Sequence, residues 1–199
     1  MDKVINLGIP HVGELIFENI DTPELYKCLE VSQTWKELAE NVLIKRWKGK
    51  MFEACKNGKT RIVKLLFERC NSEESGLNTA FIKAWQEGHI RIVKLLLHHL
   101  DSNIELNAKD IVGRTALMWA CGNGHTAIVK LLLDHSDRTF ELNFKDQFGM
   151  TAFRWACFDG HTDVVQLLLD NSNQGLELNA RDKHGGSGFS YACSNGHKD

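Results

Sequence analysis

Residues 115–135 read TALMWACGNGHTAIVKLLLDH, and residues 151–171 read TAFRWACFDGHTDVVQLLLDN, so the chain repeats one pattern after 36 positions. One glycine marks the same place in every copy of this pattern. It recurs, after one interval of 30 residues and then three of 36, at Gly58, Gly88, Gly124, Gly160 and Gly196. A fixed period of this size is typical of stacked repeat units rather than of one globular core.

Each copy contains two short helical patterns. The first precedes the glycine and carries small residues, such as Ala116 and Ala120, that allow close helix packing. The second places aliphatic residues on one face, in the third copy Ile128, Val129, Leu131 and Leu132. Thr115 stands where an N-cap is expected, and Gly124 stands where the chain must turn left-handed. Because such short helices are marginal alone, the pattern predicts helix hairpins that are stable only in a stack.

The segments between copies end in Asp-x-x-Gly, at residues 110–113 and 146–149, which is a turn signal. An apolar and polar alternation precedes this signal, so we expect a projecting loop or β-hairpin. The first junction is six residues shorter, and its sequence NSEESGLNTAF (residues 71–81) contains no such turn. The hairpin between the first two copies is therefore predicted to be missing or stunted.

The stretch DIVGRTALMWACGNGHTAIVKLLLDHS (residues 110–136) resembles the ankyrin repeat, whose pattern is Asp-x-x-Gly-x-Thr-Pro-Leu-His-x-Ala-Ala-x-x-Gly-His before an aliphatic helix. Ala116 and Ala152 replace the usual proline, Met118 and Arg154 replace the usual histidine, and the period exceeds the typical ~33 residues. The resemblance covers residues 49–199 as about four units and a truncated fifth. It implies an all-α ankyrin-repeat solenoid of helix-turn-helix units with β-hairpin loops. The fifth unit stops before its second helix, which indicates either a piece of a longer array or a frayed end.

Residues 1–48 lie outside the repeat and contain both prolines of the chain, Pro10 and Pro23. Apolar residues between positions 12 and 20 follow helical spacing, and Pro23 lies in a strong helix-start signal. Trp35, Leu38 and Val42 share a third helical face. The pattern predicts three short helices that bury little surface alone, so they should pack on the repeats, on another protein, or on both.

The N-terminal segment IPHVGELIFENIDTPELYKCLEVSQTWKELAENVLIKRW resembles an F-box over residues 7–47, with Ile9-Pro10 in place of the usual Leu-Pro. The order of Pro10, Ile16, Ile20, Leu25, Leu29, Val31, Ser32 and Trp35 carries the likeness. The family implies docking onto the Skp-type adaptor of a cullin-RING ubiquitin ligase. The adaptor-binding residues that it implies are Pro10, Leu15, Ile16, Ile20, Leu25, Val31 and Trp35.

One repeat position carries Glu53, Lys83, Trp119, Trp155 and Tyr191 in successive units. A buried core position would hardly accept a lysine or a glutamate, so we expect this position to be partly exposed. The ankyrin likeness places it in the concave groove. The aromatics there are either binding anchors for a protein or covers for the base of the long loops. The likeness implies further substrate-protein contacts at Ile111, Val112, Arg114, Asn123, Gln147, Phe148, Met150, Phe158 and Asp159.

Composition narrows the function classes. The formal charge of −2 argues against nucleic acid as the main partner, and neither a membrane span nor a secretory signal is visible. We therefore expect a cytoplasmic or nuclear monomer with no membrane partner. Four of the six cysteines recur at one repeat position and should be reduced and buried between helices. Cys121 and His125 have a zinc-compatible spacing, but Gly124 interrupts the helical face, so we expect structural histidines, no metal and no cofactor. No catalytic motif is present, and we expect no enzyme activity.

Two functions remain open. In the first, the protein is a substrate-recognition adaptor, whose F-box-like helices recruit a ubiquitin-ligase core while the ankyrin groove holds a protein substrate. In the second, it is an ankyrin scaffold without a ligase, and residues 1–48 only cap the open end of the stack. The scaffold predicts that Val12, Ile16 and Trp35 are buried against Phe52 and its neighbours, whereas the adaptor leaves part of this surface open. A zinc hydrolase built on the Cys/His pairs is a distant third possibility.

Overall fold

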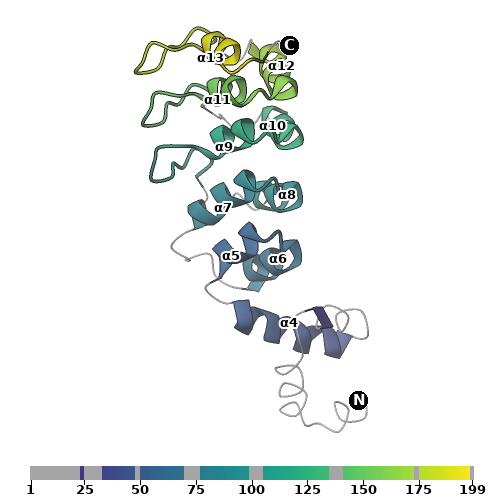
Figure 1. The fold of residues 1–199 in the computed structure, drawn as a ribbon. Helices are drawn as coiled ribbons and strands as arrows, with labels where there is room; N and C mark the ends of the chain where they lie inside the picture. The colour runs from purple at the N-terminus through teal and green to yellow at the C-terminus, as the bar shows by residue number, and fades with distance from the viewer. Residues whose placement is uncertain are drawn as a thin grey trace.

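The computed structural model describes residues 23–24, 33–47, 50–69, 77–98, 105–134, 141–172 and 175–197. Within these residues, one long helix, α4 (Gln33–Trp47), precedes a column of helix pairs and a last single helix (Figure 1). We number the pairs as units 1 to 4 and the last helix as unit 5. Their helices are α5 (Met51–Lys56), α6 (Thr60–Arg69), α7 (Leu77–Gln86), α8 (Ile90–His98), α9 (Ala116–Gly122), α10 (Thr126–Leu133), α11 (Ala152–Asp159), α12 (Thr162–Asp170) and α13 (Gly188–Ser194).

The helices form two layers. The first helices of the units, α5, α7, α9, α11 and α13, pack on one another in order, and the second helices α6, α8, α10 and α12 form the other layer (Figure 1). The expected aliphatic face of the second helices is directed to the core but only partly buried: in α10, Leu131 is half-buried beside the buried Ile128, Val129 and Leu132. Each fully buried side chain stabilises the fold by about 1.5–3 kcal/mol. This arrangement confirms the all-α ankyrin-type solenoid.

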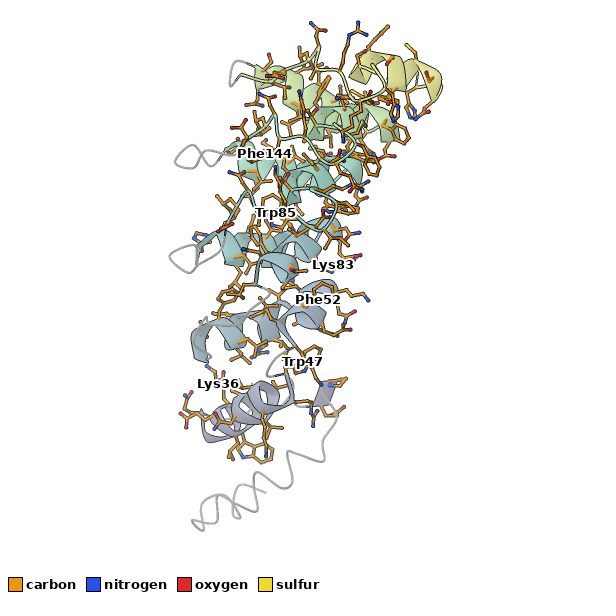
Figure 2. The ribbon with its side chains drawn as sticks, turned by 90° about the vertical axis from the view of Figure 1, so that its left-hand side faces the viewer. Lys36, Trp47, Phe52, Lys83, Trp85 and Phe144 are labelled. Carbon is orange, nitrogen blue, oxygen red and sulfur yellow. The ribbon has the colours of Figure 1, made fainter. Side chains whose placement is uncertain are left out.

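Small residues of the first helices lie at their contacts, as Ala120 and Cys121 do, both without exposed surface. Unit 2 differs because Trp85 occupies the place of Cys121 and is equally buried. Figure 2 shows Trp85 inside the column and Lys83 of the same helix pointing outward. The exposed Cys193 contradicts the expectation of burial, because no described residue covers its side of α13, whereas Cys55, Cys121 and Cys157 are buried and free.

The helix ends are built as expected. The hydroxyls of Thr115 and Thr151 accept the backbone N–H groups of Met118 and Arg154, both at 3.4 Å. Gly124 turns left-handed with φ of 70°. In units 3 and 4, these local signals in the sequence therefore mark where the first helix begins and where it ends, whereas α5 begins after Lys50, which provides no side-chain cap.

The loops are turns rather than β-hairpins, which corrects one expectation. Among the described residues the only β-bridge joins Lys109 and Thr115. The turn is instead held by the Asp110 carboxylate, which accepts the backbone N–H groups of Val112 and Arg114, both at 2.9 Å. Aspartates at 146 and 182 do the same in the next two units. Backbone hydrogen bonds, such as those from Asp110 N–H to the Arg114 carbonyl and from Gly113 N–H to the Asp110 carbonyl, close the same turns, so the aspartate side chain reinforces a short backbone turn.

The loops before α9, α11 and α13 project to the same side of the column, away from the layer of second helices (Figure 1). The junction of units 1 and 2, where a stunted loop is predicted, lies partly outside the described residues. Helix α4 packs against α6, and its Ala39, Val42 and Leu43 join the same core as the repeats. None of the described helices combines the length and apolar character that crossing a bilayer requires.

Candidate protein-binding surface

The aromatic repeat position has a defined geometry. Trp119 donates its indole N–H to the Asp110 carboxylate at 2.9 Å, and Trp155 donates to Asp146 at 3.0 Å. The hydroxyl of Tyr191 donates to Asp182 in the same way. In each of units 3 to 5, therefore, the turn aspartate holds the aromatic ring nine residues later. All three rings are half-buried, as expected for this position, and their polar atoms are already paired with the protein.

Arg114 fills the space between the first two of these rings. Its guanidinium carbon lies 4.6 Å from the Trp119 ring centre and 4.0 Å from the Trp155 ring centre. Its Nε lies 3.7 Å from the Asp146 carboxylate, and the side chain is 19% exposed. A guanidinium between two indoles gains cation–π attraction on both faces. Arg114 thus links units 3 and 4 on the groove side.

Phe158 fills the next space along the row. Its ring centre lies 5.8 Å from that of Trp155 and 5.4 Å from that of Tyr191, with edge-to-face geometry in both pairs. The result is a continuous row across three units, which we call the groove strip. The groove strip consists of Trp119, Arg114, Trp155, Phe158 and Tyr191.

The predicted contact residues of the turns differ in exposure. Ile111 is fully exposed and Phe148 is 46% exposed, so both present apolar surface at the turn tips. Gln147 is exposed and Val112 half-buried. Met150 is only 5% exposed, which removes it from the predicted contacts, because an apolar side chain at this place gains more from burial. The turns therefore offer alternating apolar and polar contacts beside the groove strip.

A second row lies at the ends of the first helices, where side chains reach back to the preceding unit. Asn123 donates its amide to the Gln86 carbonyl at 2.8 Å, and Asn195 donates to the Phe158 carbonyl at 2.7 Å. Asp159 occupies the same place in unit 4, is exposed, and has no donor to offer. Partial burial raises the pKa of Asp159 above its usual value, although the charges of His161, Arg114 and His197 act in the opposite direction.

The repeated histidines are structural, as the family resemblance implied. The Nε2 of His125 lies 2.9 Å from the Gln86 carbonyl oxygen, and that of His161 lies 2.8 Å from the Gly122 carbonyl oxygen. Each ring also packs on the left-handed glycine of the preceding unit. Among the residues that the structure describes, no three His, Cys, Asp or Glu side chains gather into a possible metal site.

One polar network was not foreseen. Arg154 is buried, donates to the Gly149 carbonyl at 2.6 Å, and pairs with the Asp182 carboxylate of unit 5 at 2.8 Å. Burial alone would raise the pKa of Asp182. Hydrogen bonds from Tyr191 and from the backbone of Gly186 and His184, with the Arg154 charge, instead hold this pKa at about 2. The recurrence of Asp-x-x-Gly nine residues before each aromatic could have revealed the pairing of each turn aspartate with its aromatic ring, but not the contact of Arg154 with Asp182.

The buried thiols are unsuited to chemistry. Burial raises the pKa of Cys55 to about 12 and that of Cys157 to about 11, and it raises the pKa of Cys121 as well. A thiol with a raised pKa stays protonated and is a poor nucleophile at neutral pH. These residues therefore act as small apolar groups between helices.

Most of the predicted adaptor-binding residues lie outside the described part of the chain: Pro10, Leu15, Ile16, Ile20, Leu25 and Val31. Trp35 lies on α4, is half-buried, and packs against the core. Phe52, which the scaffold hypothesis would cover, is 42% exposed.

The family model described as "Ankyrin repeats (3 copies)" matches residues 48–110, 102–182 and 138–199, and no F-box is found. No curated protein matches the chain. Proteins with ankyrin repeats generally act as interaction modules without catalysis, which supports a role in protein–protein interaction here. The matched stretches extend over most of the sequence and coincide with the helix pairs, so the chain belongs to the ankyrin-repeat family.

Proposed function

We propose that the protein binds a protein substrate through the groove strip and, through its F-box-like N-terminal segment, presents this substrate to a cullin-RING ubiquitin ligase. The observation that carries the proposal is the groove strip itself, in which Arg114 and Phe158 fill the spaces between Trp119, Trp155 and Tyr191. Tryptophan, tyrosine and arginine are the residue types that dominate binding energy at protein interfaces.

The groove strip is pre-organised for binding. The turn aspartates fix the rings of Trp119 and Trp155 before any partner arrives. Binding then loses little side-chain entropy, which leaves more of the interaction energy as affinity. The exposed Ile111 and Phe148 lie in the turns next to this row and extend the apolar surface. This combination supports a peptide or protein segment as the ligand.

The ligase half of the proposal rests on the residues of the F-box-like segment, above all Pro10, Ile16 and Trp35. The packing of α4 favours the competing function, a scaffold without a ligase. Ala39, Val42 and Leu43 of this helix are buried in the core of the stack, whereas Phe52, which the cap is expected to cover, is 42% exposed. A capping role for α4 is compatible with adaptor binding by residues that precede this helix. An experiment is therefore needed to distinguish the ligase adaptor from the scaffold without a ligase.

The deciding experiment is a pull-down of the purified protein with a purified Skp-type adaptor. The wild type is compared with the Pro10→Ala, Ile16→Asp double variant, and circular dichroism verifies that both are folded. We expect stoichiometric capture by the wild type and loss of capture by the variant. A folded wild type that captures no adaptor would overturn the ligase function and leave the ankyrin scaffold.

The groove is tested separately with a library of random linear peptides displayed on phage. Peptides selected on the wild type should lose at least tenfold in affinity for Phe148→Ser, because Phe148 lies beside the groove strip. Phe189→Ser is the matched control, since Phe189 is 78% exposed but lies on α13 at the outer end of the stack. Equal losses in both variants would contradict binding in the groove.

A further inference from the structure

Five residues occupy the last position of the first helices or the turn that follows: Asn57, Glu87, Asn123, Asp159 and Asn195. Four of them already have a polar partner. The amide of Asn57 bonds Glu53, Glu87 pairs with Lys83 at 2.7 Å, and the two remaining asparagines bond carbonyls of the preceding unit. Within the described residues, the Asp159 carboxylate makes no hydrogen bond and no ion pair. One carboxylate in this row is thus left to interact with a ligand.

This carboxylate lies beside Gly122, at the edge of the groove strip. A Cβ atom on Gly122 would lie 3.4 Å from Asp159 Oδ2 and 3.5 Å from Trp155 Cβ, so these two side chains flank the bare backbone of Gly122. In the next unit the corresponding residue is Phe158, whose ring fills the space between Trp155 and Tyr191. Gly122 carries no side chain in unit 3, and the guanidinium of Arg114 lies between Trp119 and Trp155 instead. A ligand side chain can therefore approach the Asp159 carboxylate only along the bare backbone of Gly122, beside Arg114.

We propose that Asp159, Gly122 and Trp155 form a subsite for a cationic side chain, arginine or lysine, of the peptide segment bound in the groove. The inference rests on the proposed function of the groove and specifies which ligand it takes. An ammonium or guanidinium group completes the missing pairing of Asp159 through a charge-assisted hydrogen bond. The aliphatic stem of such a side chain covers the edge of the Trp155 ring and the backbone of Gly122.

The electrostatic surroundings agree with this assignment. Partial burial raises the pKa of Asp159, and the nearby charges of Arg114, His161 and His197 do not offset this effect. Arg114 is held between two indoles and shares the Asp146 carboxylate with the indole N–H of Trp155. It therefore leaves the Asp159 carboxylate without a direct partner. A ligand cation stabilises the ionised form of the carboxylate and thereby offsets the desolvation that its own binding adds.

The test selects displayed random linear peptides on the wild type and on Asp159→Asn. We expect wild-type selections to share one arginine or lysine, whose replacement by alanine in a synthetic peptide weakens binding at least tenfold. The same replacement should weaken binding to Asp159→Asn less than twofold. Asp163→Asn is the matched control, because it removes an exposed carboxylate of α12 and should retain the tenfold effect. Urea unfolding verifies the stability of both variants.

The outcomes separate the subsite from the groove. Selected peptides without a shared basic residue, or an equal loss on the wild type and on Asp159→Asn, would overturn the subsite. If those peptides still lose affinity for Phe148→Ser, the proposed function of the groove stands. Selections that yield no binding peptide count against both the subsite and the groove.

Discussion

Arg154 of α11 and Asp182 of the following turn form an ion pair of 2.8 Å between units 4 and 5, with side chains 0% and 1% exposed. Ile82 and Met118 occupy the place of Arg154 in units 2 and 3. The contact between units 4 and 5 is therefore charged at this place, whereas the preceding units have an apolar side chain there. A buried pair of this type contributes little net stability compared with apolar packing, but removal of one partner leaves a buried charge. A single substitution in this ion pair should therefore lower the stability of the contact between units 4 and 5.

Replacement of Asp182 tests this sensitivity. Asp182→Asn keeps an oxygen for the turn N–H groups but leaves the buried guanidinium without its counter-charge, and we expect a loss of about 3–5 kcal/mol of unfolding free energy. Asp110→Asn is the control, because Asp110 makes the same turn bonds opposite Ile82, and it should cost about 1 kcal/mol. Urea unfolding followed by circular dichroism measures both. Equal losses would show that the turn, not the ion pair, carries the energy.

The same carboxylate predicts a dependence on pH. The pKa of Asp182 in the folded protein is about 2, below the 3.8 of an unperturbed aspartate. Its contribution to stability is therefore present above about pH 4 and is lost as the pH falls toward 2. Urea unfolding at about pH 5 and about pH 3 should show a larger loss for the wild type than for Asp182→Asn. Parallel losses would mean that other carboxylates account for the acid sensitivity.

The repeat itself was predictable because its signals are local. The caps at Thr115 and Thr151, the left-handed Gly124, and the alternation of small and aliphatic residues depend on neighbours within a few positions. The half-buried place of Trp119 followed from Lys83 and Glu53 at equivalent positions. A comparison between copies thus indicates how exposed a position is, which the pattern of a single helix does not indicate.

The polar pairings could not be predicted because they depend on how adjacent units are placed. Arg154 meets an aspartate 28 residues later, and Arg114 meets a tryptophan of the next unit. The spacing of residues within one copy does not predict either contact, because both contacts join different units. The burial of Met150 and the exposure of Cys193 also depend on what lies against them. The sequence thus predicted the groove position but not the groove strip.

Arg114 should contribute through its planar shape as well as its charge. Arg114→Ala removes the stacking on Trp119 and Trp155, and we expect a loss of about 1–2 kcal/mol in urea unfolding. Arg114→Lys retains the charge but not the planar stacking, and should lose more than half of this amount. Arg91→Ala, an exposed arginine of α8, is the control and should change stability by less than about 0.5 kcal/mol. Full rescue by lysine would reduce the role of Arg114 to its charge.

The left-handed glycines provide a matched pair. Gly124 and Gly196 have φ of 70° and 77°, so alanine at either place costs about 1 kcal/mol for the backbone alone. A Cβ at Gly124 would also lie 2.6 Å from His161 Nδ1, whereas no atom of the described residues lies within 4 Å of a Cβ at Gly196. We expect Gly124→Ala to lose about 2 kcal/mol more than Gly196→Ala in thermal or urea unfolding. Similar losses would show that the His161 ring moves aside without cost.

Asp159 provides a prediction of increased stability. Asn123 and Asn195 each donate to a carbonyl of the preceding unit, and Asp159 stands in the same place with the Gly122 carbonyl as the corresponding acceptor. Asp159→Asn supplies the missing donor, so the free energy of unfolding should rise by about 0.5–1.5 kcal/mol. The reciprocal change, Asn123→Asp, should lower it by a similar amount because the Gln86 carbonyl loses a donor. Urea unfolding measures both variants at neutral pH.

The reciprocal pair also separates this hydrogen bond from a general effect of charge. Both substitutions alter one negative charge at equivalent places of neighbouring units, and the measurement is repeated at high salt, which screens exposed charges. A hydrogen bond predicts opposite changes of similar size that persist in salt. Changes that vanish in salt would contradict the missing-donor explanation and assign the effect to repulsion among carboxylates. If Asp159→Asn still raises the free energy of unfolding at high salt, the native aspartate makes unit 4 less stable than an asparagine would. A residue that lowers stability in this way is expected where a free carboxylate is retained for binding.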